Sequence, residues 1–160
     1  MGDTSEFSLS IRLFLKGYRW RRIDPVPWSP LQRPLAECRL ALITSAGFYV
    51  PDQDPFDNGY RGGDFSYREI PGDVEVSGLL ENHRSETFDH KGVQMDPNLA
   101  FPLDRLREFV ESGRIGSLND RHFSFMGSIT APGRLMKESA PEVAEKLVSD
   151  EVSTALLVPV

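Results

Sequence analysis

The sequence predicts an α/β domain with a mainly parallel sheet and flanking helices, incomplete at its C-terminal end. Residues 40–43 form a short apolar run closed by small residues and Gly47, which is typical of a buried strand entering a loop. Residues 102–112 repeat apolar side chains at helical spacing. Residues 154–160 are almost continuously apolar, which is typical of a strand buried on both faces deep in a sheet. Strands that alternate with helices favour a parallel sheet.

Residues 1–34 are expected to form an N-terminal arm and a proline-rich connector, and residues 35–160 the α/β domain. Four prolines between residues 24 and 34 favour extended or turn backbone over helix, with Trp28 as the expected anchor. A cluster of positive side chains upstream could bind an acidic partner or a membrane surface, but a solvated arm is the favoured interpretation. This cluster contains Arg12, Lys16, Arg19, Arg21 and Arg22.

Shorter elements follow the first strand. Residues 51–64 are rich in turn-forming residues and predict a long surface loop. Residues 65–70 then predict a short strand, and residues 75–82 a short helix. Two further short strands are predicted at residues 115–118 and 123–126.

Two longer helices are predicted in the second half of the chain. The clearer one starts at Pro102, a residue suited to the first helical position, and Asp104 complements the positive helix start. Gly113 is expected to end it in a left-handed conformation. Residues 135–150 predict one helix or two, interrupted at Pro141. The apolar face of the clearer helix contains Leu103, Leu106, Phe109 and Val110.

Composition and charge exclude several classes of protein. A net charge of -6 argues against general nucleic-acid binding. No apolar run is long enough to span a bilayer, so no membrane partner is expected. Cys38 is the one cysteine, which excludes an internal disulfide and a zinc site built from several thiolates. A reducing, cytoplasmic setting fits this cysteine usage.

The densest group of chemically capable side chains lies between residues 81 and 105. A histidine with nearby carboxylates can act as a base or bind a metal. His83 and His90 are seven residues apart, which matches no zinc pattern, so no metal is expected. Asn98 is equally well explained as a cap of the following helix. The group contains His83, Asp89, His90, Asp96 and Asn98.

Asp64 and Arg68 form a second candidate group. They are four residues apart and would point to the same face of a strand. Arg68 could clamp a ligand carboxylate, but a structural ion pair with Asp64 or Asp73 is the favoured interpretation.

Three further residues are given structural interpretations. Cys38 has no partner cysteine and is interpreted as a structural thiol. His122 is interpreted as a satisfied surface or semi-buried histidine rather than a catalyst. Gly127 marks a close approach of the backbone to another group. No nucleophile therefore stands out within the chain.

Four segments of the chain, in order, resemble the selenoprotein B family of the glycine, sarcosine, betaine and D-proline reductases. They are "PLAECRLALITSAGFY", "GGDFSYREIPGD", "DPNLAFPLDRLREFVESGRIG" and "HFSFMGSI". The likeness covers roughly residues 28–160 and is strongest to the short, stand-alone members. It implies reductive cleavage of a carbon–nitrogen bond in an amino acid or its N-methylated relative, an oxidoreductase activity.

The resemblance also implies where the nucleophile lies. The family uses a selenocysteine or a cysteine in a U-x-x-C or C-x-x-C motif, directly after an apolar strand that ends much like "LLVPV". We therefore expect the nucleophile directly after Val160, with the reading frame cut at an in-frame UGA codon for selenocysteine. A resolving cysteine would then close a mixed selenide–sulfide for reduction by a thioredoxin-like partner.

The pocket and the partners are implied in the same way. His83, Asp96 and Asn98 fall in a motif of the family and are expected to line the pocket, followed by Asp64 and Arg68. The chain itself is expected to hold no cofactor. In the D-proline branch a pyruvoyl group on another subunit holds the substrate, so a second reductase subunit is expected.

Two other interpretations stay open on the residues alone. A non-catalytic binding or assembly module that ends at Val160 would explain why no nucleophile is visible. A redox-inert enzyme could use His83 and carboxylates for acid–base chemistry.

Overall fold

The computed structural model describes residues 7–18 and 22–160. The chain divides into two compact units, Met1–Pro30 and Leu31–Val160. The first unit contains one helix, α1 (Leu9–Gly17), none of whose residues is buried. The expected solvated arm therefore contains a helix that the sequence analysis does not predict.

Local capping explains where α1 begins. The Ser8 side chain accepts a hydrogen bond from the N–H of Ile11 at 3.5 Å. Trp28 is exposed within this unit, and its role as an anchor stays a prediction. Arg19 and Arg21 of the predicted basic cluster lie outside the described residues.

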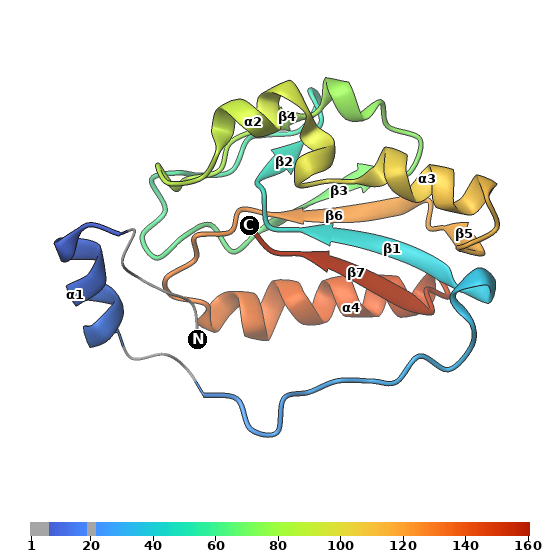
Figure 1. Cartoon of the computed structure of the whole chain (residues 1–160), viewed down its shortest axis with the longest axis horizontal. Helices are drawn as coiled ribbons and strands as arrows, with labels where there is room; N and C mark the ends of the chain where they lie inside the picture. Colours follow the sequence, from blue (N-terminus) through green and yellow to red (C-terminus); the bar gives the residue numbers. More distant parts are fainter. Residues whose placement is uncertain (1–6, 19–21) are drawn as a thin grey trace. The chain divides into compact units, whose positions relative to one another are not determined.

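The second unit is built on a mixed, mostly parallel sheet, as predicted (Figure 1). β1 runs parallel to β5, β6 and β7, and β3 runs antiparallel to β6. Ile43 pairs with Phe123 of β6 on one edge of β1 and with Leu157 of β7 on the other. The strands are β1 (Arg39–Thr44), β3 (Tyr67–Pro71), β5 (Ser117–Leu118), β6 (Arg121–Phe125) and β7 (Thr154–Val158).

A buried histidine, His122, lies where the partner strand of β1 changes from β5 to β6. Leu40 of β1 pairs with β5, whereas Ile43 pairs with β6. Between them, the N–H of Leu42 donates to Nδ1 of His122 at 3.1 Å. The side chain thus replaces a missing ladder bond, because a buried backbone N–H needs an acceptor.

The predicted helix over residues 75–82 is wrong. This stretch forms a single 3₁₀ turn (Val76–Gly78) followed by the short strand β4 (Leu80–Glu81). β4 pairs antiparallel with β2 (Phe48–Tyr49) to make a separate two-stranded sheet. Tertiary pairing with β2 satisfies the backbone here, and it overrides the local preference for helix.

Helices cover both faces of the main sheet (Figure 1). α2 (His90–Met95), the 3₁₀ turn Pro97–Leu99 and α3 (Leu103–Glu111) lie on one side, and α4 (Ala140–Ser149) lies on the other. None of the helices within the described ranges is long and apolar enough to cross a bilayer.

The two predicted helices form with small differences at their starts. Pro102 is the N-cap of α3 rather than its first residue, and Asp104 lies in the first turn as predicted. Gly113 follows the helix with φ +70°, the left-handed conformation that glycine adopts without strain. A π-helical turn (Leu135–Ser139) runs directly into α4, with Pro141 in its first turn. The expected interruption is therefore a change of helix geometry.

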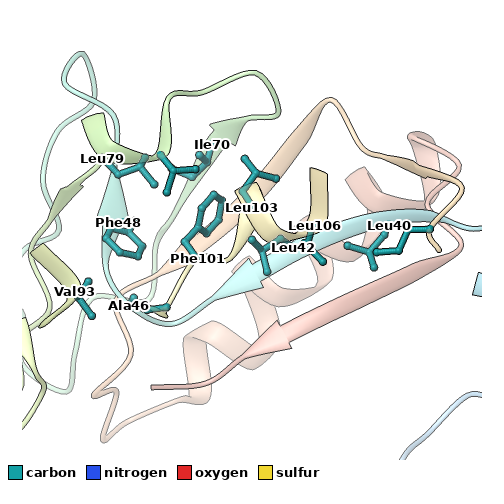
Figure 2. Close-up of a cluster of buried hydrophobic side chains, with 13 residues drawn as sticks. Leu40, Leu42, Ala46, Phe48, Ile70, Leu79, Val93, Phe101, Leu103 and Leu106 are labelled. Atoms are coloured by element: carbon teal, nitrogen blue, oxygen red, sulfur yellow. The ribbon is translucent and has the colours of Figure 1, made fainter. Parts of the chain in front are cut away.

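The main core lies between the sheet and α3 (Figure 2). Leu40 and Leu42 of β1 face Leu103 and Leu106 of α3, and Phe48 packs edge-on against Phe101. Alternate residues of β1 therefore point to opposite faces, which leaves Ile43 toward α4. Burial on both faces explains the continuous apolar run of β1.

β7 differs from its prediction in burial. It is a strand as predicted, but Leu157 is 65% exposed, so the strand is not buried on both faces. Within residues 22–160, β7 pairs with β1 alone. Its opposite edge therefore has no paired strand within that range.

Candidate active site

Two loops and the segment after β7 lie close together where the parallel strands end. Ser45 follows β1, Gly127 follows β6, and Val160 follows β7. The N–H of Val160 donates to Oγ of Ser45 at 3.0 Å, and the N–H of Gly47 donates to the carbonyl of Phe125 at 2.8 Å. In open α/β sheets, ligands bind at this carboxyl edge.

Two hollows open at this edge. One is a mixed polar pocket of about 340 Å³, and the other is an apolar groove of about 450 Å³ between the sheet and α4. Gly127 borders the groove and the next residue, Ser128, borders the pocket, so the two hollows are neighbours. The pocket is lined by His83, Ser85, Thr87, Phe88, Asp89, Ser128 and Val160.

His83 is the most enclosed side chain of the pocket lining. It lies two residues after the end of β4, and its side chain is held against the ring of Phe88, with ring centroids 4.4 Å apart. Its backbone N–H donates to the carboxylate of Glu81, and its Nδ1 accepts from the N–H of Ser85 at 3.1 Å. Burial lowers the pKa of His83, which favours the neutral ring.

Two glycines let the chain pass close to His83. A Cβ on Gly127 would lie 2.6 Å from Nε2 of His83, and one on Gly47 would lie 3.0 Å from its backbone nitrogen. Both glycines have positive φ angles. The predicted close approach at Gly127 is confirmed, and its partners are the imidazole of His83 and the carbonyl of Ser45.

His90 supports this region through two hydrogen bonds of its ring. Its Nδ1 lies 2.9 Å from Glu81, and its Nε2 lies 3.0 Å from the carbonyl of Ser85. Both ring nitrogens therefore face acceptors. The hydrogen bond to Glu81 raises the pKa of His90 and favours the doubly protonated ring.

Asp96 and Asn98 lie apart from this pocket and cap helical turns. Asp96 accepts from the N–H of Asn98 at 3.0 Å. Asn98 accepts from the N–H of Asp104 at 3.1 Å and donates to its carboxylate at 2.9 Å. These contacts match the capping interpretation of Asn98, and neither residue lines the pocket of His83.

Asp64 and Arg68 organise the long loop instead of pairing with each other. Asp64 accepts from the backbone N–H groups of Asp57 and Ser66, each at 2.8 Å. Burial would raise the pKa of Asp64, but hydrogen bonds from these residues and the charge of Arg68 outweigh it and lower the pKa. Arg68 donates to the carbonyls of Asp54 and Pro55. The favoured ion pair of Arg68 with Asp64 or Asp73 is not formed among the described residues.

Neither Cys38 nor His122 lines the pocket of His83. Cys38 is buried before the amino end of β1, and its thiol points to the carbonyl of Pro34 at 3.5 Å. The pocket lies at the opposite end of this six-residue strand, roughly 20 Å away. The interpretation of His122 as a satisfied surface or semi-buried residue is wrong, because the residue is fully buried and its Nε2 has no hydrogen-bond partner. Among the described residues no group of acidic, histidine or cysteine side chains could hold a metal.

Sequence reasoning singled out His83, Asp89, His90 and Gly127 in this region but missed Glu81, Ser45 and Ser128. Ser45 and Ser128 lie in segments that resemble the family, but nothing in those segments marks either serine as part of a pocket. Ser128 has a φ of 45°, which no local pattern predicts for a serine. Only the fold brings these loops together.

The fold and the pocket define an α/β protein whose candidate ligand crevice lies at the carboxyl ends of parallel strands, beside a buried histidine. The sequence model of the family described as glycine/sarcosine/betaine reductase selenoprotein B matches residues 9–159. The chain therefore belongs to this family, as the resemblance of its motifs predicts.

Curated relatives are components of such reductases. The chain is 33% identical to D-proline reductase subunit gamma of Acetoanaerobium sticklandii, over 84% of this chain and 54% of the relative. It is 27% identical to sarcosine reductase complex component B subunit beta of Peptoclostridium acidaminophilum, over 84% of this chain and 30% of the relative. It is 28% identical to glycine reductase complex component B subunit gamma of Symbiobacterium thermophilum, over 88% of this chain and 32% of the relative. The chain thus spans about half the length of the first relative and about a third of the others. No solved structure matches it.

Proposed function

We propose that this chain is the scaffold that presents a selenol or thiol nucleophile in a reductase cleaving a carbon–nitrogen bond. The substrate class is an amino acid or its N-methylated relative. The observation that carries the proposal is the position of Val160, which lines the pocket of His83 at the carboxyl edge of the sheet. A residue directly after Val160 would enter a pocket with both polar and apolar walls.

The proposed reaction proceeds in two steps. The selenolate or thiolate attacks the carbon that bears nitrogen, and the carbon–nitrogen bonding pair leaves with nitrogen, which takes up a proton. A resolving cysteine then attacks selenium or sulfur, and the carbon product leaves with the bonding pair and takes up a proton. The resulting selenide–sulfide or disulfide is reduced by a thioredoxin-like dithiol.

Partners are part of this proposal. The relatives are named as subunits of D-proline, sarcosine and glycine reductases, which supports a second subunit here. A pyruvoyl group on that subunit would hold the substrate, as the resemblance to the D-proline branch implies. Nothing in this chain would then need to bind a cofactor. The required free thiols place the reaction in a reducing compartment such as the cytoplasm.

The nucleotides after the codon of Val160 test the position of the nucleophile. An in-frame UGA or a cysteine codon there, followed by codons for two residues and a cysteine, supports the proposal. Any other residue at that position contradicts it.

An activity assay on the assembled reductase tests the chemistry. Serine in place of the nucleophile should abolish amine release, whereas Cys38→Ala should retain it because Cys38 lies at the other end of β1. Amine release that survives the serine replacement contradicts the proposal.

A further inference from the structure

His83 carries an unpaired hydrogen-bond donor inside the pocket. The side chain is 6% exposed, and Nε2 has no hydrogen-bond partner. Because Nδ1 accepts from the N–H of Ser85, a neutral ring carries its proton on Nε2. A buried donor without an acceptor costs free energy, and such groups in native proteins call for an explanation.

Burial, rather than the surrounding charges, favours a neutral ring at His83. Besides the ring itself, the charged groups facing this region are Glu81 of β4 and Asp89 and His90 at the start of α2. The imidazole rings of His83 and His90 have centroids 6.4 Å apart. Burial lowers the pKa of His83, Glu81 opposes this effect, and His90 adds to it.

The end of β7 approaches this donor from the other side. Ser45 holds Val160 through its N–H, and the carbonyl of Ser45 lies 2.4 Å from the position of a Cβ on Gly127. Nε2 of His83 lies 2.6 Å from that same position. Ser45 thus lies close both to the end of β7 and to the loop that packs on Nε2, and His83 and Val160 line the same pocket.

We infer that His83 is a catalytic residue whose Nε2–H donates a hydrogen bond to the anionic nucleophile that follows Val160. This inference rests on the proposed function, and it assigns His83 the role of holding the selenolate or thiolate in its charged form. A hydrogen bond to an anion favours that anion over its protonated form. A positive charge on His90 would act in the same direction from further away.

The test uses the full-length protein with cysteine as the nucleophile. Alkylation by iodoacetamide is followed at that residue by peptide mass spectrometry across pH 5 to 10, because only the thiolate reacts. His83→Phe removes the donor, and the amide of His83→Asn is too short to reach the position of Nε2, so these two variants are donor-free at that position. His83→Gln places an amide N–H near the position of Nε2. Buried Cys38 serves as the internal control for unfolding.

We expect both donor-free variants to shift the alkylation profile to higher pH and to slow the reaction at pH 7 by roughly tenfold. The glutamine variant should stay within about threefold of the parent protein. If His83→Phe exposes Cys38 to alkylation, His83→Asn decides the result. Unchanged profiles in folded donor-free variants overturn the inference.

This readout separates the inference from the proposed function. A nucleophile that is essential for amine release but insensitive to His83 leaves the function standing and overturns the role of His83. A position after Val160 that is neither selenocysteine nor cysteine overturns both.

Discussion

The backbone N–H of Val160 donates to Oγ of Ser45 across 115 positions of sequence, at 3.0 Å. Ser45 also donates from Oγ toward the carbonyl of Val160 at 3.4 Å. One serine side chain therefore fixes the end of β7 against the turn that follows β1. This contact determines where the chain leaves the sheet, and with it the position of the proposed nucleophile.

Ser45→Ala should loosen this end of the chain. The lost hydrogen bond is worth about 1 kcal/mol, so the amide of Val160 should exchange hydrogen roughly fivefold faster. Hydrogen exchange followed by NMR measures this directly. Ser149→Ala, on an exposed position at the end of α4, is the matched control and should change nothing near Val160. Equal exchange in both variants would contradict the role of Ser45.

Gly127→Ala should destabilise the protein and disturb His83. Its new Cβ would lie 2.4 Å from the carbonyl of Ser45, at a φ of +66° that alanine rarely adopts. We expect a loss of about 1–3 kcal/mol in the free energy of unfolding, measured with urea. Gly133→Ala has no heavy atom within 4 Å of its Cβ and should stay within about 0.5 kcal/mol of the parent. A tolerated Gly127→Ala would mean that the loops do not approach this closely.

His122 should make stability depend on pH between 6.5 and about 4. Burial, and then the charge of Arg107, lowers the pKa of His122 from 6.5 to about 4. The unfolded chain therefore binds a proton first as the pH falls, so the folded state loses stability through this window, on the order of 3 kcal/mol. Below pH 4 this contribution is constant.

The variant His122→Asn isolates this effect. Its amide oxygen can still accept from the N–H of Leu42, but it cannot titrate. Urea unfolding at several pH values should show a flatter profile between pH 6.5 and 4 for this variant. A slope equal to that of the parent protein would assign the pH dependence to other groups.

Asp150 should act in a lower pH window. Arg121 donates to both of its carboxylate oxygens at 2.7 Å. The hydrogen bonds from Arg121 lower the pKa of Asp150 from 3.8 to about 2, despite partial burial. The folded carboxylate thus contributes roughly 2 kcal/mol above pH 4, and this stability is lost as the pH falls through about 2.

Asp150→Asn should remove that contribution. The difference in the free energy of unfolding between the parent and this variant should have its full value at pH 5. It should approach zero as the pH falls to 2. Asp120→Asn is the control, because its carboxylate is 95% exposed in its ion pair with Arg39. A difference between parent and Asp150→Asn that does not vary with pH would refute the assignment.

Most strands and helices were predictable from the sequence, including the short strands β3, β5 and β6, whereas β2 and β4 were not. The apolar run of β1 and the amphipathic pattern of α3 identify these elements because each has enough residues to show a pattern. β2 and β4 have two residues each, so no period exists to read, and the predicted helix over residues 75–82 replaced a strand. Their pairing depends on contacts between distant segments.

The candidate site was predictable only in part. His83 was singled out by its neighbouring polar residues, and Gly127 by its position after a strand. Asp96 and Asn98 come from the same stretch of sequence, yet they cap helical turns away from the pocket. Closeness in sequence therefore predicted more shared site residues than the structure has. His83 lies in the loop after β4, whereas Asn98 lies in the 3₁₀ turn before α3.

Local pattern alone settled the α/β class and the family. Those properties follow from the order of apolar runs and from four motifs in register. The tertiary structure decided that Nε2 of His83 is buried and unpaired, on a residue that lines the same pocket as Val160. Periodicity acts within one element, whereas the hydrogen bonding and charge of a pocket depend on groups that packing brings together from distant parts of the chain.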